Sequence, residues 1–330
     1  MGSPREGFLR EQRPERASRD RSVQAPPVLL TATDRLILVY LGGLAGLAAF
    51  SHPRPGLLLS GIGVLALSVV GVALWGARSG LGRVTHDFFP VPMVVCTFSL
   101  TGPVIAATNP VFWDARFAAL DQELFPGLAA AWYGALGRPW WLSEAAAGLY
   151  FSYYLIPVAM GVALYRAGRH AEFDAFAFTV VATLLVSYVC YFVTPTLGPR
   201  IAIDREAAVL GGAGLSRGLR WFLHAVEFNQ LDAFPSGHTA LSLVFLALGW
   251  RLFPRWRLPL SLLVAGILFS TVYLSLHYVI DLMGGALLAA LMPIFLPVLR
   301  YGVGARDHRP SSNARQRPDD QPIRSKRPPR

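Results

Sequence analysis

Eight apolar segments of the sequence are long enough, or nearly long enough, to cross about 30 Å of hydrocarbon as helices. Several contain Gly and Pro, which membrane helices tolerate where neighbouring helices satisfy the backbone. The sixth segment is the shortest. The chain is therefore predicted to be an all-α integral membrane protein of about eight transmembrane helices, over residues 34–50, 57–76, 88–107, 143–166, 174–194, 238–253, 258–275 and 279–299.

Composition supports the same class. Hydrophobic residues make up 53% of the 330 residues and charged residues only 15%, whereas soluble domains carry about 25% charged residues. An ordinary soluble enzyme and a mainly disordered chain are both excluded on this basis. The net charge of +10 is not taken as a nucleic-acid signal, because the basic residues gather in the tails and in the short gaps between apolar segments.

Basic residues also predict the orientation. With both tails on one side of the membrane, that side collects 23 of the 30 Lys and Arg residues and the opposite side 7. The positive-inside rule then places both termini in the cytoplasm. The long segments 108–142 and 195–237 are expected on the outer face, where the helical spacing of apolar residues in 114–136 favours a helix lying along the membrane surface.

Ionisable residues inside membrane spans are the first functional candidates, because charge is costly there. His277 and Asp281 stand four positions apart at the start of the last span, so they share one face of a helix. His238 begins the sixth span behind a Pro-Ser-Gly turn, where a helix N-terminus offers N–H groups to an anion. Arg200 ends a Pro/Gly-rich outer turn and suits phosphate binding.

All of these groups are expected on the same face. Two histidines, a carboxylate, a guanidinium and a helix N-terminus suggest nucleophilic phosphoryl chemistry. In such chemistry one histidine attacks phosphorus, the other protonates the departing oxygen, and the cation and backbone donors hold the developing charge.

These residues resemble a known family. FPSGH at 234–238 and YLSLHYVIDLMGG at 273–285 are similar to the signature pair of the type 2 phosphatidic acid phosphatase superfamily. The resemblance is nearest to the inositol phosphorylceramide synthase branch, the aureobasidin-resistance-type inositolphosphotransferases. It covers roughly residues 88–299, and its further features are DQELFPG at 121–127, GLYFSYYLIP at 148–157 and YFVTPTLGPR at 191–200.

The resemblance implies a role for each site residue and no cofactor. His277 would be the nucleophile that forms a phosphohistidine, supported by Asp281, and His238 the general acid. Ser236 and Gly237 would bind phosphate oxygens. The predicted organisation is a disordered cytoplasmic tail (1–33), two N-terminal spans (34–87), a six-helix catalytic core (88–300) and a disordered basic cytoplasmic tail (301–330).

Two departures from the superfamily pattern favour the inositolphosphotransferase branch. The usual first motif, a Lys followed at a seven-residue offset by Arg-Pro, is missing, and Arg200 stands in its place. The arginine expected six positions before the last histidine is here Thr271. Arg200 is thus the predicted phosphate-binding cation.

The predicted function is cleavage of a lipid phosphoester through phospho-His277 at the outer membrane face, with a phospholipid or lipid phosphate as substrate. Transfer of a headgroup phosphate to a lipid alcohol is favoured, with inositol phosphate as donor group and a ceramide-like acceptor. A phosphatase that uses water as acceptor is the alternative within this class. From another class, a non-catalytic transporter would use the His/Asp cluster as a proton relay.

Simpler interpretations remain for individual residues. His277, Asp281 and His238 are also a possible metal-ligand set, Arg200 an anchor at the interface, and Ser236 a helix cap. A membrane belt is slightly favoured for three tyrosines over the lining of a headgroup groove. These are Tyr150, Tyr153 and Tyr154. Elsewhere, His86 is expected to be solvated, Glu144 to reach the interface, and Cys96 and Cys190 to be inert core thiols.

Overall fold

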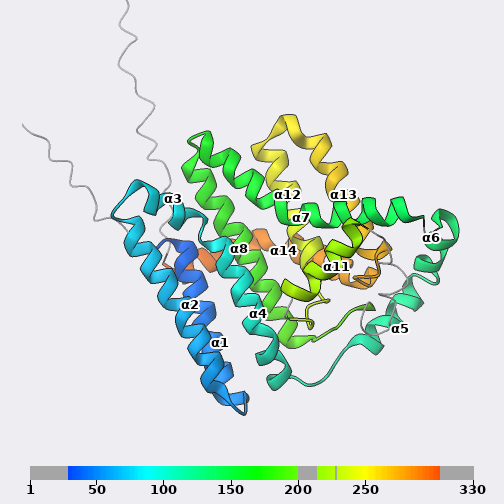
Figure 1. Cartoon of the computed structure of the whole chain (residues 1–330), viewed down its shortest axis with the longest axis horizontal. Coiled ribbons are helices and arrows are strands. Elements are labelled where there is room, and N and C mark those ends of the chain that lie inside the picture. Colours follow the sequence, from blue (N-terminus) through cyan, green and yellow to red (C-terminus); the bar gives the residue numbers. More distant parts are fainter. Residues whose placement is uncertain (1–28, 138, 200–213, 227–228, 305–330) are drawn as a thin grey trace, which may run out of the picture.

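The computed structural model describes residues 29–137, 139–199, 214–226 and 229–304. Within these ranges the secondary structure is helical and contains no strand (Figure 1), which confirms the predicted all-α class. The helices are α1 (Ala32–Ser51), α2 (Pro55–Gly76), α3 (Gly80–Phe88), α4 (Pro90–Thr108), α5 (Asp114–Leu124), α6 (Leu128–Leu136), α7 (Trp140–Arg166), α8 (His170–Val193), α11 (Leu215–Val226), α12 (Gly237–Leu252), α13 (Arg257–Tyr273) and α14 (Val279–Gly302).

Seven candidate membrane spans occur in the described ranges: α1, α2, the continuous α3–α4 segment, α7, α8, α13 with the short turn before it, and α14. Their outward faces carry large apolar side chains in contact with the surroundings, such as Leu57 at 86% exposure and Leu67 at 73%. Apolar surface of this extent is stable in lipid and not in water. The chain is accordingly a multi-pass membrane protein.

The predicted sixth span differs from the other seven. Helix α12 has only 16 residues, so it is about 24 Å long at about 1.5 Å per residue. It begins at Gly237 because the preceding residues Phe234–Ser236 form the turn that carries the first histidine motif. The expected count of about eight spans therefore becomes seven full-length candidates and one shorter, central helix.

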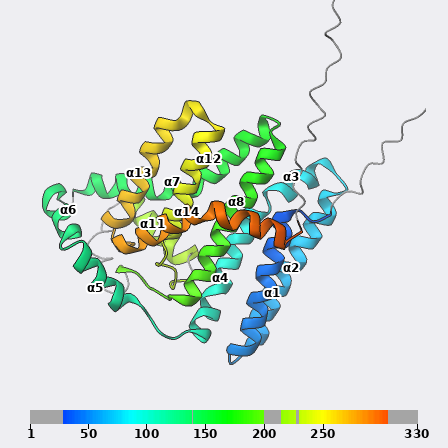
Figure 2. The ribbon, with the colours of Figure 1, turned by 180° about the vertical axis from the view of Figure 1, so that it is seen from behind.

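Helix α12 lies at the centre of the site-bearing half of the bundle. It packs against α7, α8, α13 and α14, and its side chains Ala240, Leu241 and Phe245 are buried. Figure 2 shows the same group of helices from behind, with α12 and α13 beside α7 and α14. The N-terminal pair α1 and α2 is on the other flank, where α1 packs against α4 and α8.

Hydrogen bonds between distant segments define the two ends of the bundle. At one end Arg35 Nη1 donates to the carbonyl of Gly304 at 3.2 Å, so the start of α1 lies beside the end of α14. At the other end Asn109 Nδ2 donates to the carbonyl of Phe192 at 3.0 Å. This arrangement agrees with spans that alternate in direction and return the chain to the side from which it started.

Residues 114–136, predicted to form one surface helix, form two helices, α5 and α6, separated by Phe125, Pro126 and Gly127. Proline cannot continue a hydrogen-bonded helix, and Gly127 has a φ of +70°. Helix α5 packs against α14, and Phe117 on its inner side stacks on Phe234 with ring centroids 4.3 Å apart. This packing brings α5 to the first histidine motif.

Candidate active site

His277 stands in a tight turn between α13 and α14. The carbonyl of Thr271 accepts the N–H groups of both Leu276 and His277, at 2.9 and 3.1 Å, and Ser275 adopts a φ of +56°. Thr271 is the position at which the resembled superfamily has an arginine, and here its backbone closes the turn. The turn fixes the main chain of His277 one residue before the N-cap of α14.

The predicted pairing of His277 with Asp281 is present. His277 Nδ1 is 3.4 Å from Asp281 Oδ2, and the two side chains are 7% and 0% exposed. The same carboxylate oxygen accepts the N–H of Tyr278 at 2.9 Å, which holds it at the start of the helix. A carboxylate on Nδ1 favours the tautomer in which Nε2 carries a free electron pair.

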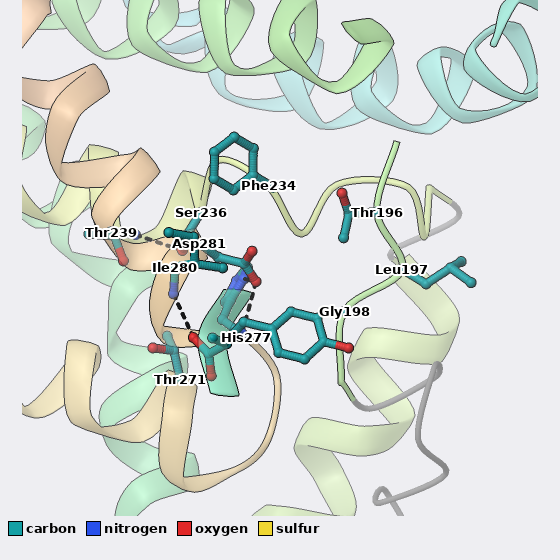
Figure 3. Close-up of polar contacts among 12 residues, drawn as sticks. Thr196, Leu197, Gly198, Phe234, Ser236, Thr239, Thr271, His277, Ile280 and Asp281 are labelled. Atoms are coloured by element: carbon teal, nitrogen blue, oxygen red, sulfur yellow. Dashed lines mark hydrogen bonds and ion pairs between the residues drawn. The ribbon is translucent and has the colours of Figure 1, made fainter. Parts of the chain in front are cut away.

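The first histidine motif is joined to the second through backbone. Ser236 N donates to the carbonyl of Asp281 at 3.0 Å, and Ser236 Oγ caps α12 by accepting the N–H of Thr239 at 3.2 Å. Figure 3 shows Ser236 and Thr239 on one side of His277 and Asp281, with Gly198 on the other side. Ser236 therefore acts as a helix cap, which is the simpler of the roles predicted for it from the sequence.

Two glycines in α14 make this approach possible. A Cβ on Gly285 would lie 2.5 Å from the carbonyl oxygen of Ser236, and a Cβ on Gly284 would lie 2.7 Å from the ring of Phe234. Cβ atoms do not approach other heavy atoms this closely, so any larger residue would push α14 away from the turn. The Gly-Gly pair thereby sets the spacing between the two histidine motifs.

The two histidines face each other across this junction, with ring centroids 5.7 Å apart. The ring of His238 also lies against Tyr153 at 4.3 Å and Tyr150 at 4.5 Å. Both tyrosines are buried, at 2% exposure for Tyr150 and 8% for Tyr153, so the membrane-belt interpretation is wrong for them. Their rings flank His238 and restrict its orientation. A hydroxyl from α8 is also close, because a Cβ on Gly237 would be 2.8 Å from Tyr191 Oη.

The turn that precedes Arg200 lies beside the second motif. Gly198 has a φ of +82°, and a Cβ there would be 3.0 Å from the carbonyl oxygen of Leu276. Asp114 holds the turn with both carboxylate oxygens, which accept the N–H groups of Leu197 and Gly198 at 3.0 and 2.9 Å. Arg200 itself lies outside the described residues, so its predicted phosphate contact remains a prediction.

A second carboxylate supports the start of α14. Asp121 Oδ1 accepts the N–H of Ile280 at 2.9 Å, where a helix N-terminus favours negative charge. Burial raises the pKa of Asp121, and hydrogen bonds from the N–H groups of Ile280 and Val279 oppose that rise. Asp121 therefore links α5 to the helix that carries Asp281.

Several of these supporting residues have only weak signals in the sequence. Asp114 is one of several polar loop residues without a distinguishing pattern, and Asp121 stands out only through the DQELFPG motif. Glu144 was expected to reach the interface. It accepts the N–H groups of Gly214 and Ser216, each at 3.2 Å, and so caps α11.

The alternative for His277, Asp281 and His238 is a metal-ligand set. In the part of the chain that the structure describes, no group of three or more His, Cys, Asp or Glu side chains is arranged to hold a metal ion. The site is thus built from one His–Asp pair, a second histidine, a capped helix N-terminus and a glycine turn.

Comparison with known proteins agrees with this arrangement. A sequence model of the PAP2 superfamily matches residues 115–295, which contain both histidine motifs, Asp281 and the turn at Gly198. Phosphoinositol dihydroceramide synthase from Bacteroides thetaiotaomicron is 25% identical over 179 residues, which are 50% of this chain and 58% of that protein. The match thus spans less than two thirds of that relative's length. No solved structure matches the chain.

Proposed function

The chain belongs to the PAP2 superfamily, and we propose that it is a membrane phosphotransferase that moves a headgroup phosphate between lipids through a phosphohistidine at His277. The observation that carries the proposal is the pair of histidine rings 5.7 Å apart, with Asp281 on Nδ1 of His277. One ring is thereby oriented as a nucleophile and the other is close enough to serve the leaving group.

In the first step Nε2 of His277 attacks the phosphorus of the donor phosphodiester. A P–N bond forms while the bond from phosphorus to the oxygen of the departing alcohol breaks, and protonated His238 gives its proton to that oxygen. Asp281 stabilises the positive charge that develops on the imidazole of His277. The product of this step is a headgroup-phosphoryl histidine and a free lipid alcohol.

In the second step an acceptor alcohol attacks the phosphohistidine. His238, now neutral, takes the proton of the acceptor hydroxyl, and the P–N bond breaks as the new P–O bond forms. A water molecule in the acceptor position would give hydrolysis by the same route. Access of water or lipid alcohol to the second position decides between transferase and phosphatase.

The charge on the transferred phosphoryl group needs donors. Gly237 and Ser236 are proposed to bind its oxygens through the N-terminal turn of α12, where the helix dipole favours an anion. Arg200 is proposed as the cation, delivered by the turn that Asp114 holds next to Leu276. These donors stabilise charge that increases in the transition state.

The substrate pair is proposed as an inositol-phosphate donor lipid and a ceramide-like alcohol. The name of the Bacteroides relative, a phosphoinositol dihydroceramide synthase, supports this choice. We further propose that the site faces the extracytoplasmic or lumenal side, that both termini are cytoplasmic, and that residues 88–300 form the catalytic unit behind two N-terminal spans. The asymmetry of Lys and Arg supports this orientation.

Product analysis by mass spectrometry tests the proposal. Purified protein in detergent receives phosphatidylinositol, ceramide and a lipid phosphate together, and His277→Ala serves as the blank. We expect an inositol-phosphate-bearing sphingolipid and diacylglycerol. Free phosphate with dephosphorylated lipid would make the protein a lipid phosphatase, and no product above the blank would favour the proton-relay alternative.

Metal dependence has its own control. Chelation of zinc and magnesium is expected to leave turnover unchanged, because the proposed chemistry uses only side chains and backbone. Loss of turnover on chelation, followed by recovery with added metal, would instead support the metal-ligand interpretation of His277, Asp281 and His238.

A further inference from the structure

A cavity of about 230 Å³ extends from the proposed active site into the bundle. Gly237 and His238 line it at one end, and Asp87 and Phe88 line it at the other. These two pairs belong to opposite ends of the bundle, because His238 begins α12 and Phe88 precedes α4. The cavity is therefore continuous with the site and leads away from it along the spans.

Helix α8 is the floor of this cavity. Its lining residues extend from Phe173 to Tyr191, a separation of 18 positions that corresponds to about 27 Å of helix at about 1.5 Å per residue. A hydrocarbon layer is about 30 Å thick. The cavity is thus a groove that follows nearly the whole depth of a membrane and is longer than one lipid leaflet.

Helices α4 and α7 are the walls. Both pack against α8, and they are not among the helix pairs with extensive mutual packing in the described chain. Figure 1 shows both helices next to α8. Val91 and Val95 of α4 and Val158 of α7 line the groove and are also 40–45% exposed. The groove consequently opens sideways, toward the lipid that surrounds the bundle.

Most of the lining is aliphatic or aromatic, and Asp87, Asp232 and His238 lie toward its ends. Valine, leucine and phenylalanine side chains form the middle, among them Val94, Val180, Val181 and Leu184. Such a surface offers no hydrogen-bond partner to a headgroup, and burial of methylene groups there is favourable by about 0.8 kcal/mol each. The chemistry of the middle of the groove fits a hydrocarbon chain.

We propose that this groove binds one hydrocarbon chain of the lipid that reacts at His238 and His277, and that its depth selects chain length. The inference rests on the proposed function, because that function makes the occupant a substrate lipid. The hydrocarbon chain enters from the membrane between α4 and α7. The polar group of the lipid lies at His238, and the far end of the hydrocarbon chain lies toward Phe88.

Gly161 marks the position where the groove can be shortened. It lines the cavity on α7, and a Cβ there would meet Phe173 at 3.4 Å, Phe88 at 3.7 Å and Phe176 at 3.8 Å. A leucine at this position would fill the groove in the half farther from His238. Ala163 on the same turn of α7 is exposed, so Ala163→Leu is a matched control that adds the same side chain outside the groove.

The test is photo-crosslinking of the full chain in lipid nanodiscs. Two probes are used, a phosphatidylinositol and a ceramide, each with a diazirine near the middle of one acyl chain and each in a long-chain and a short-chain form. We expect saturable attachment to groove residues of α4 and α8, identified by peptide mass spectrometry. The probe that labels the groove shows whether the bound hydrocarbon chain belongs to the donor lipid or to the acceptor lipid.

Gly161→Leu is expected to lower long-chain labelling about 10-fold or more and to leave short-chain labelling unchanged, while Ala163→Leu changes neither. Three results would overturn the proposal. The labelling could fail to saturate, it could be located on the lipid-facing sides of α1 and α2, or it could decrease equally for both acyl-chain lengths in Gly161→Leu. Mapping on the unaltered chain stands even where the variant does not fold.

The same labelling is carried out in His277→Ala, which is inactive under the proposed function. If the unaltered protein shows saturable groove labelling but no turnover, the proposed reaction is refuted and the binding site for the hydrocarbon chain is retained. If the unaltered protein shows turnover but no groove labelling, the binding site for the hydrocarbon chain is refuted and the reaction is retained.

Discussion

In the part of the chain that the structure describes, two histidine–aspartate pairs lie at opposite ends of the bundle, and one of them belongs to the proposed active site. His277 and Asp281 are separated by 3.4 Å at 7% and 0% exposure. His86 and Asp34 are separated by 2.8 Å at 11% and 3% exposure. By distance alone, the second pair would be the better candidate.

The surroundings distinguish the two pairs. Asp34 Oδ2 also accepts the N–H and the hydroxyl of Thr31, both at 2.7 Å, so the second pair completes the N-terminal cap of α1 and joins it to α3. The pair at His277 has a second histidine ring 5.7 Å away and a helix N-terminus beside it. A histidine paired with a carboxylate becomes a candidate for catalysis only where such partners and a substrate path are present.

The largest expected effect sharpens this contrast at the nucleophile. His277→Asn keeps an amide near the position of Nδ1 but removes the attacking nitrogen, so turnover should fall by at least about 10⁴-fold. Steady-state lipid product formation and thermal unfolding in detergent are measured together. Turnover within 10-fold of the unaltered chain, with the fold intact, would assign the nucleophile elsewhere.

A smaller effect is expected from the spacing between the motifs. Gly285→Ala places a Cβ 2.5 Å from the carbonyl of Ser236, which should cost about 1–3 kcal/mol of stability and about 100-fold in turnover. Gly71→Ala in α2, where nothing lies within 4 Å of the added atom, is the control and should be neutral in both assays. Unchanged activity in Gly285→Ala would show that the spacing is not critical.

The next effect is expected at the turn that precedes Arg200. Asp114→Ala removes both acceptors of the N–H groups of Leu197 and Gly198, so we expect turnover to fall by about 10- to 100-fold through misplacement of the turn. Asp114→Asn keeps one acceptor and should be intermediate. The order of kcat values among the three proteins checks this, and equal values would mean that the turn does not contribute to the reaction.

The smallest effect on turnover is expected at the opposite pair. His86→Ala should lower stability by about 1 kcal/mol through loss of a buried hydrogen bond and leave turnover per folded molecule unchanged. His86→Gln retains a donor near Nε2 and should recover most of the stability. Chemical unfolding and product assays measure the two properties separately. A large loss of turnover in folded His86→Ala would break the distinction between the two pairs.

Much of this molecule was accessible from its sequence. The eight apolar segments coincide with seven long spans and α12, because hydrophobic length alone specifies a membrane helix. The His277–Asp281 pair follows from helical spacing. The expectation that His86 is solvated was wrong, because its partner Asp34 is 52 positions away and pairing between α1 and α3 depends on tertiary packing.

Other features of the site could not be predicted for the same reason. Tyr150 and Tyr153 resemble a membrane belt in sequence, and only the packing of α7 on α12 brings their rings to His238. The support from Asp114 depends on a turn that is 83 positions away in the sequence. Contacts of this kind leave no periodic pattern along the chain.

The central claim is a covalent intermediate on one particular histidine. The most direct measurement is rapid-quench labelling with a donor lipid that carries radioactive phosphate in its headgroup, followed by peptide mapping. The account predicts an acid-labile, base-stable label on the peptide that contains His277, absent in His277→Asn and retained in His86→Ala. Label on any other residue, or label that persists in His277→Asn, would contradict it.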